Sequence, residues 1–174
     1  MTDTELQQKR LIAAAIDIAI VIVVCIAIGI GEFVVQLVLA HSGIGVIAMG
    51  AVGFIGQIAI LGFILARDVV MGDRSLGKKF QEIRVVDSGG RPIEFMDSAK
   101  RNAIFAIGSV LGVVSGAFQM IPCVGHLVAC LLLPLLLLGA LVGLVAVIVE
   151  LVKIIQDPAG IRFGDQFAGT KVVR

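Results

Sequence analysis

The sequence has no tryptophan and no tyrosine, and charged residues fill only 16% of its 174 positions. Aromatic belts of tryptophan and tyrosine usually mark the two membrane interfaces, so anchoring there falls to lysine and arginine. The charges are also unevenly distributed: residues 102–149 carry none, and residues 11–66 carry only Asp17 and Glu32. With 59% hydrophobic residues, this pattern excludes a soluble enzyme, a disordered tail and a classical DNA-binding domain. It indicates an integral membrane protein that contacts the lipid bilayer and no nucleic acid.

Cysteine and histidine are scarce as well. The three cysteines are an odd number within or beside apolar segments, which argues against a disulfide framework. Cys123, His126 and Cys130 repeat at three and four residues, but a tetrahedral site needs a fourth ligand. The nucleophile-elbow, zinc-protease and EF-hand motifs are missing. We therefore expect no metal site, no cofactor and no enzymatic activity.

The two apolar blocks predict an all-α membrane protein. One spanning helix takes about 20 apolar residues, so each block has room for two helices joined by a turn. The turns are expected at 41–43 and 121–126, where glycine, proline and histidine interrupt the apolar pattern. The predicted spans lie near 11–39, 45–66, 102–121 and 127–152, within a single domain over residues 1–174.

The basic residues predict the orientation. Of the 14 lysines and arginines, two precede the first span, eight lie in the loop 67–101, four follow Glu150, and none lies in a turn. The positive-inside rule then places both termini, the loop 67–101 and the tail 153–174 in the cytoplasm. The expected location is the cell (inner, cytoplasmic) membrane.

The loop 67–101 predicts a small cytoplasmic β-hairpin. Residues 80–87 are rich in β-branched side chains, Ser88-Gly89-Gly90 is a turn signal, and residues 91–93 are a possible return strand. The tail 169–174 is a third candidate strand. Asp97 is a candidate N-cap for the helix that leads into the third span.

The loop also contains a glycine-rich motif, because residues 72–78 satisfy the pattern G-x-x-x-x-G-K of a phosphate-binding loop. The next position is Lys79, where such a loop needs a serine or threonine hydroxyl, and no strand leads into it. We therefore reject nucleotide binding here. Four basic residues instead predict either contact with anionic lipid head groups or a plain solvated face: Arg74, Lys78, Lys79 and Arg84.

Asp17 is the polar residue that anchoring does not explain. An ionised aspartate well inside a span costs about 2.5–3.5 kcal/mol, so we expect it to face protein or water and to have a partner. Arg10 lies two helical turns away and is too distant for an ideal ion pair. The other candidates are Arg101 and Asn102 at the mouth of the third span, and Arg162 and Asp165 in the tail. An ion pair that joins the first helix to the tail and a transport site are equally compatible with this pattern.

Glycines spaced four apart predict close helix contacts. Gly108, Gly112 and Gly116 share one helix face, and Gly139 and Gly143 repeat the spacing. We favour packing within one chain over a dimer face.

Four ordered motifs resemble the RDD family, which is named for one arginine and two aspartates. They are residues 9–17 with Arg10 and Asp17, residues 72–90, the pair Arg101-Asn102, and residues 162–172 with Asp165 as the second aspartate. The resemblance implies a membrane protein with a suspected role in transport, including cation/proton exchange.

Two functions follow as hypotheses. In the first, Asp17 binds a proton or monovalent cation, Arg10 tunes its affinity, and Asp165 with Arg162 gates the cytoplasmic mouth. Four spans leave little room for two inverted repeats, so a transporter of this size is expected to be a homo-oligomer. In the second, the chain is a scaffold or accessory subunit whose basic face binds anionic lipid or a protein.

Overall fold

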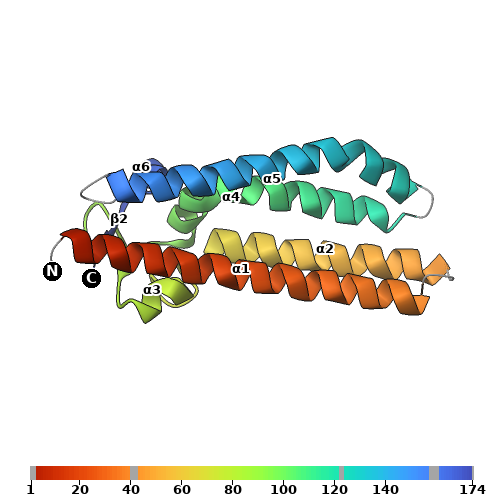
Figure 1. Cartoon of the computed structure of the whole chain (residues 1–174), viewed down its shortest axis with the longest axis horizontal. Helices are drawn as coiled ribbons and strands as arrows, with labels where there is room; N and C mark the ends of the chain where they lie inside the picture. The colour runs from red at the N-terminus through yellow and green to blue at the C-terminus, as the bar shows by residue number, and fades with distance from the viewer. Residues whose placement is uncertain (1–2, 40–42, 122–123, 157–160, 174) are drawn as a thin grey trace. The chain divides into compact units, whose positions relative to one another are not determined.

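The computed structural model describes residues 3–39, 43–121, 124–156 and 161–173 (Figure 1). Its elements follow in the order α1 (Asp3–Leu39), α2 (Gly43–Ala66), α3 (Leu76–Phe80), β1 (Arg84–Asp87), α4 (Phe95–Gln119), α5 (Val124–Gln156), α6 (Phe163–Ala168) and β2 (Thr170–Val173). The candidate spans are Thr4–Leu39, Ile47–Ala66, Phe95–Gln119 and Cys130–Gln156. The four predicted spans are thereby confirmed as helices. Residues 41–42 and 122–123 of the two predicted turns lie outside the described residues, whereas Gly43 begins α2 and residues 124–126 belong to α5.

The chain forms two compact units. Unit 1 comprises residues 1–20, 62–105 and 144–174, and unit 2 comprises residues 21–61 and 106–143. All 14 basic residues belong to unit 1, whereas Glu32 is the single charged residue of unit 2. The segments that the positive-inside rule assigns to one side of the membrane are therefore the segments that make up unit 1.

Unit 2 is an apolar helical unit built on small residues. A Cβ at Gly116 would lie 2.9 Å from the Cα of Phe54, and one at Gly139 would lie 3.3 Å from the Cα of Gly108. These approaches confirm the favoured interpretation that the glycine face packs within one chain. Gly143 differs from the prediction, because a Cβ there meets nothing within 4 Å.

The spanning helices expose large apolar side chains. Val23, Leu37 and Leu131 are each about two-thirds exposed, at 65%, 66% and 68%. An apolar surface of this extent is stable only against lipid, because water would impose the full hydrophobic penalty on it. The exposure agrees with an integral membrane protein.

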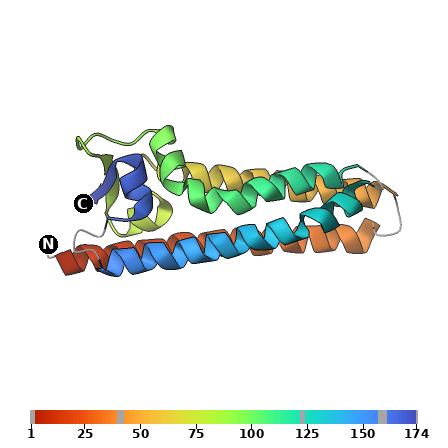
Figure 2. The same ribbon diagram turned by 90° about the horizontal axis from the view of Figure 1, so that it is seen from above.

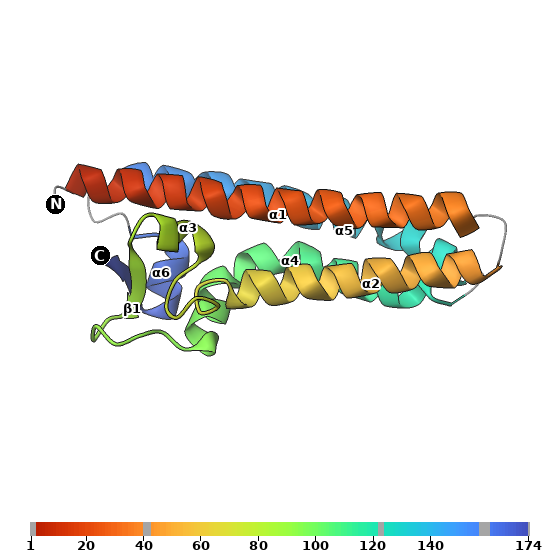
Figure 3. The ribbon, with the colours of Figure 1, turned by 90° about the horizontal axis from the view of Figure 1, so that it is seen from below.

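Unit 1 has a small apolar core beneath a two-stranded sheet. β1 pairs antiparallel with β2, with Val85 opposite Val172. The core consists of buried side chains from α1, the loop and the tail: Ala13, Ile83, Val85, Ile93 and Val172. Figures 2 and 3 show α3, α6 and the strands at the same end as the first turns of α1.

The sheet confirms the predicted strand element, but its pairing differs from a hairpin. The tail is the partner of β1, whereas the expected return strand 91–93 contributes one isolated bridge between Val86 and Pro92. Proline has no N–H to donate, which disfavours the extension of this bridge into a longer ladder.

Asp97 caps α4 from inside the helix. α4 begins at Phe95, and the Asp97 carboxylate accepts a 3.0 Å hydrogen bond from the backbone N–H of Glu94. The sequence had suggested Asp97 as the N-cap residue, but it lies inside the helix. It sits in the first turn and forms one half of a capping box.

Candidate functional site: a buried charge cluster in unit 1

Asp17 holds the glycine-rich loop. Its carboxylate accepts a 2.6 Å hydrogen bond from the hydroxyl of Ser75 and a 2.8 Å bond from the backbone N–H of Gly77. Ser75 is also the N-cap of α3, where its hydroxyl accepts a hydrogen bond from the N–H of Lys78. The glycine-rich loop thus binds an anion, as its motif suggests, but the anion is the protein's own carboxylate.

This arrangement corrects the expected partners of Asp17. Among the described residues, Ser75 and Gly77 supply its hydrogen bonds, rather than Arg101, Asn102, Arg162 or Asp165. The sequence analysis considered charged and amide side chains as partners, whereas the hydrogen bonds in the structure come from a hydroxyl and a backbone N–H. Gly77 permits this approach, because a Cβ there would overlap the carbonyl oxygen of Ala13.

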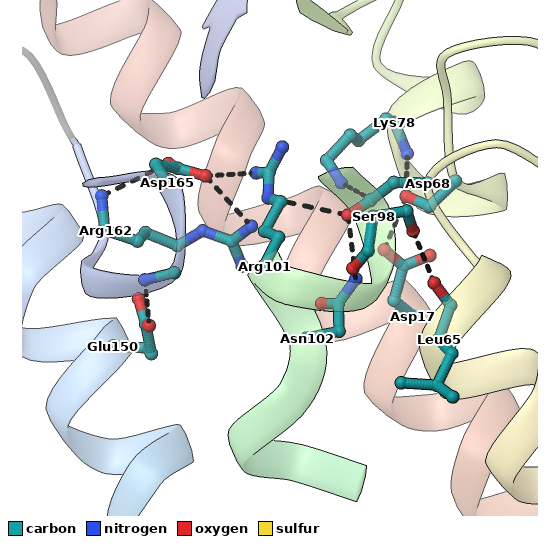
Figure 4. A network of polar contacts seen from close by, with 12 residues as sticks. Asp17, Leu65, Asp68, Lys78, Ser98, Arg101, Asn102, Glu150, Arg162 and Asp165 are labelled. Atoms are coloured by element: carbon teal, nitrogen blue, oxygen red, sulfur yellow. Dashed lines mark hydrogen bonds and ion pairs between the residues drawn. The ribbon is translucent and has the colours of Figure 1, made fainter. Parts of the chain in front are cut away.

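Asp68 is the acid at the centre of the cluster (Figure 4). It is fully buried and forms an ion pair with the ammonium group of Lys78. Asn102 Nδ2 donates a 3.1 Å hydrogen bond to Asp68 Oδ2, and Arg101 Nε lies 3.5 Å from the same oxygen. Three cationic or amide side chains therefore converge on one carboxylate.

Asp165 forms the second acidic centre. Its Oδ1 lies 2.7 Å from Arg101 Nη2 and 3.5 Å from Arg162 Nη2. The carboxylate also accepts a 3.2 Å hydrogen bond from the backbone N–H of Arg162, which caps α6. Arg101 consequently bridges Asp68 and Asp165, which joins the loop to the tail.

Two further contacts fix the tail in unit 1. Glu150 of α5 accepts a 3.0 Å hydrogen bond from the backbone N–H of Gly164, and Arg10 donates a 2.8 Å bond to the carbonyl oxygen of Val172. Arg10 therefore connects α1 to β2.

Asn102 is positioned by the start of α4. Its amide donates a 2.9 Å hydrogen bond to the carbonyl oxygen of Ser98, and the Ser98 hydroxyl donates a 2.6 Å bond to that of Leu65. α4 is thereby linked to the end of α2, directly before Asp68.

The sequence-predicted cluster largely meets in one place. A cavity of about 20 Å³ is lined by six charged side chains, Arg10, Asp17, Lys78, Arg101, Arg162 and Asp165. Five of these were predicted as cluster members, and Asn102 contacts the cluster through Asp68. Asp68 and Glu150 were missed as members, because both lie at the ends of spans, where an interface position explains them equally well.

The residues predicted to contact lipid head groups differ in their exposure. Lys79 and Arg84 are exposed, and Arg74 is half-buried beside Asp73 at 3.8 Å. Lys78 is only 6% exposed and pairs with Asp68, so its expected contact with lipid head groups is wrong. A lysine beside another lysine in a glycine-rich loop gives no sequence signal for burial.

The cluster shifts the protonation equilibria of the loop residues. Burial raises the pKa of Asp68, but the charges of Lys78 and Arg101 outweigh it and hold that pKa well below its ordinary value. Burial lowers the pKa of Lys78 to about 7; Asp68 opposes the shift, while Arg101 adds to it. The pair can therefore bind and release a proton near neutral pH.

The tail carboxylate stays ionised. Burial alone would raise the pKa of Asp165, but Arg101 and Arg162 lower it below the ordinary aspartate value. Its role in this pH range is that of a fixed negative charge between two guanidinium groups.

A family model matches nearly the whole chain. The RDD family model aligns with residues 7–169, a range that includes the first three motifs and residues 162–169 of the fourth. No curated protein and no solved structure matches the chain.

Proposed function

Because the chain belongs to the RDD family and is an integral membrane protein, we propose that it exchanges a monovalent cation for a proton across the membrane. The exchange pair in this proposal is Asp68 and Lys78. The proposed location is the cell membrane, with both termini and unit 1 in the cytoplasm. The predicted homo-oligomer belongs to the same proposal.

The observation that carries this proposal is a buried lysine paired with a buried aspartate. Asp68 remains ionised, and burial brings the pKa of Lys78 to about 7. A buried carboxylate needs positive charge beside it, which Arg101 and the protonated amine of Lys78 supply together. When Lys78 loses its proton, a bound cation can take the place of its ammonium group. Loss of the proton from Lys78 therefore favours cation binding at Asp68, which is the coupling that exchange requires.

Asp17 has a different part in this proposal from the one its position in a span suggests. Its carboxylate holds Ser75 and Gly77, and so positions the helix that carries Lys78. We assign it as a positioning residue rather than the cation site. Asp165 and Arg162 remain the proposed gate, since they join the tail to Arg101.

Proton release on cation binding tests the exchange pair. Purified protein in detergent, weakly buffered at pH 7 with a pH-sensitive dye, receives Na⁺, K⁺ or Li⁺ as the gluconate salt. We expect one of these cations to release protons from the wild type, and neither Lys78→Met nor Asp68→Asn to respond. Glu82→Gln is the matched control, because Glu82 is an exposed acid of the same loop. A folded wild type that releases no protons with any of the three cations would contradict the proposal.

An exposed amphipathic surface favours the second candidate function, a scaffold or accessory subunit. Phe80 is 73% exposed beside the exposed Lys79, and the exposed Arg84 follows in β1. Apolar rings next to basic side chains suit the head-group level of an anionic membrane. Vesicle co-sedimentation that depends on anionic lipid, together with no ion flux, would favour this candidate over transport.

A further inference from the structure

The cavity in unit 1 has an excess of positive charge. Four cationic side chains and two carboxylates line it. Four cationic side chains beside two carboxylates in one small cavity favour the binding of an anion or the loss of a proton.

The guanidinium group of Arg101 is not fully hydrogen-bonded within the described part of the chain. Arg101 is only 1% exposed; its Nε faces Asp68 and its Nη2 faces Asp165. Its Nη1 is buried and forms no hydrogen bond with the residues that the structure describes. An arginine whose third nitrogen is buried at a cavity is a strong donor for an anion, since leaving such a group unsatisfied costs free energy.

We propose that this cavity binds one small monatomic anion of the chloride class, with Arg101 as its central donor and Lys78, Arg10 and Arg162 as the surrounding positive charges. The size of the cavity selects the class. At about 20 Å³ it holds little more than one water-sized particle, for which about 10–15 Å³ suffices. A monatomic anion fits this volume better than a phosphate, a sulfate or a lipid head group does.

Anion binding is linked to the proton on Lys78. The charged groups that face this lysine are Arg10 and Asp17 of α1, Arg67 and Asp68 after α2, Arg101 of α4, and Arg162 and Asp165 around α6. Because arginine stays protonated and the pKa values of Asp68 and Asp165 are lowered, Lys78 is the loop group of this set that changes charge near pH 7. An anion in the cavity favours protonated Lys78, so anion affinity falls as pH rises above about 7, by up to about tenfold per pH unit.

This site is distinct from the proposed exchange of a cation, and the two have opposite proton linkage. A cation at Asp68 displaces the proton of Lys78, whereas an anion at Arg101 retains it. The anion therefore opposes the exchange if both sites exist, but its binding is measured without any cation gradient or flux.

Chloride-dependent stability tests the site. The full chain in a neutral detergent is unfolded by heat and followed by circular dichroism at 222 nm, since it has no tryptophan or tyrosine for intrinsic fluorescence. Sodium chloride is compared with sodium gluconate at equal concentration, at pH 6 and pH 8.5. We expect chloride to raise the Tm at pH 6 and to raise it much less at pH 8.5.

Three variants separate the site from a general salt effect. Ala14→Val fills the cavity from α1 without changing a charge, and we expect it to remove the chloride effect. Lys78→Met should weaken the effect and abolish its pH dependence. Lys100→Met, at an exposed lysine beside Arg101, should retain both.

The outcomes are separable. An equal Tm in chloride and gluconate for a folded wild type would overturn the anion site and leave the cation exchange standing. A chloride effect that Ala14→Val and Lys78→Met both preserve would also overturn it, because the ion would then bind elsewhere.

Discussion

Burial rather than residue type decides what each charged side chain does in unit 1. Lys78 and Lys79 are neighbours in sequence, yet Lys78 is enclosed with Asp68 and Lys79 is exposed. The exposed lysine retains a hydrated charge at little cost, whereas the buried one loses hydration and becomes a weaker base.

The buried lysine predicts a pH-dependent stability. Below about pH 7, Lys78 is protonated in both the folded and the unfolded chain, and the cost of burying its charge is fully present. Between about pH 7 and the ordinary lysine pKa of 10.5, the folded chain releases the proton while the unfolded chain keeps it, so stability rises with pH. The slope is at most about 1.4 kcal/mol per pH unit.

Thermal unfolding in gluconate buffer between pH 6 and pH 9 measures this effect. Lys78→Met should remove the rise, and Lys79→Met should retain it because its side chain is exposed. An identical pH profile for wild type and Lys78→Met would show that the lysine is not buried as a charged group.

Sequence reasoning at the residue scale identified buried acids but not their partners. Asp17 is conspicuous because it stands alone in a long apolar run, and the high cost of an unpartnered charge in lipid predicts its burial. Its partners were not predictable, because one is the backbone N–H of Gly77 and every residue except proline carries such a group. The sequence did not indicate that Asp68 is buried, because this residue lies directly after a span beside Arg67.

At the scale of elements, the short helix α3 depends on contact with α1. Asp17 and Ser75 fix its first turn, and Gly77 lies against the backbone of Ala13. Helices of five residues have little stability of their own, so this contact supplies what helix propensity does not.

Gly77→Ala tests that contact. The added methyl would overlap the carbonyl oxygen of Ala13, so α3 must move away from Asp17. We expect a loss of about 1–3 kcal/mol in the free energy of unfolding, as for other overpacked sites. Gly62→Ala is the control, because a Cβ at that helical position meets nothing within 4 Å and alanine favours a helix. Equal Tm values for Gly77→Ala and the wild type would contradict the close approach of the two elements.

The elements themselves follow from the sequence to different degrees. The long apolar runs predict four helices, because lipid leaves the backbone few other ways to satisfy its hydrogen bonds. The strand 84–87 is visible in its β-branched residues. Its partner strand is not visible in the sequence, because β2 begins 83 residues after Asp87 along the chain. Pairing at such a sequence separation depends on how unit 1 folds.

At the scale of the molecule, the charges are concentrated where the sequence predicts one side of the membrane. Unit 1 holds every basic residue, and unit 2 holds Glu32 alone among charged residues. From the positive-inside rule we expect unit 1 to face the cytoplasm, and labelling of a cysteine introduced at Glu82 with an impermeant maleimide checks this orientation.

Ion flux through the whole protein tests the central claim most directly. The wild type, Asp68→Asn and Glu82→Gln are reconstituted in liposomes that contain a pH-sensitive dye, and gradients of Na⁺, K⁺ or Li⁺ are imposed. The account predicts a cation-driven pH change in wild-type and Glu82→Gln vesicles that Asp68→Asn abolishes while its circular dichroism spectrum is unchanged. Flux that survives in Asp68→Asn, or a folded wild type that moves no protons under any of the three gradients, would contradict it.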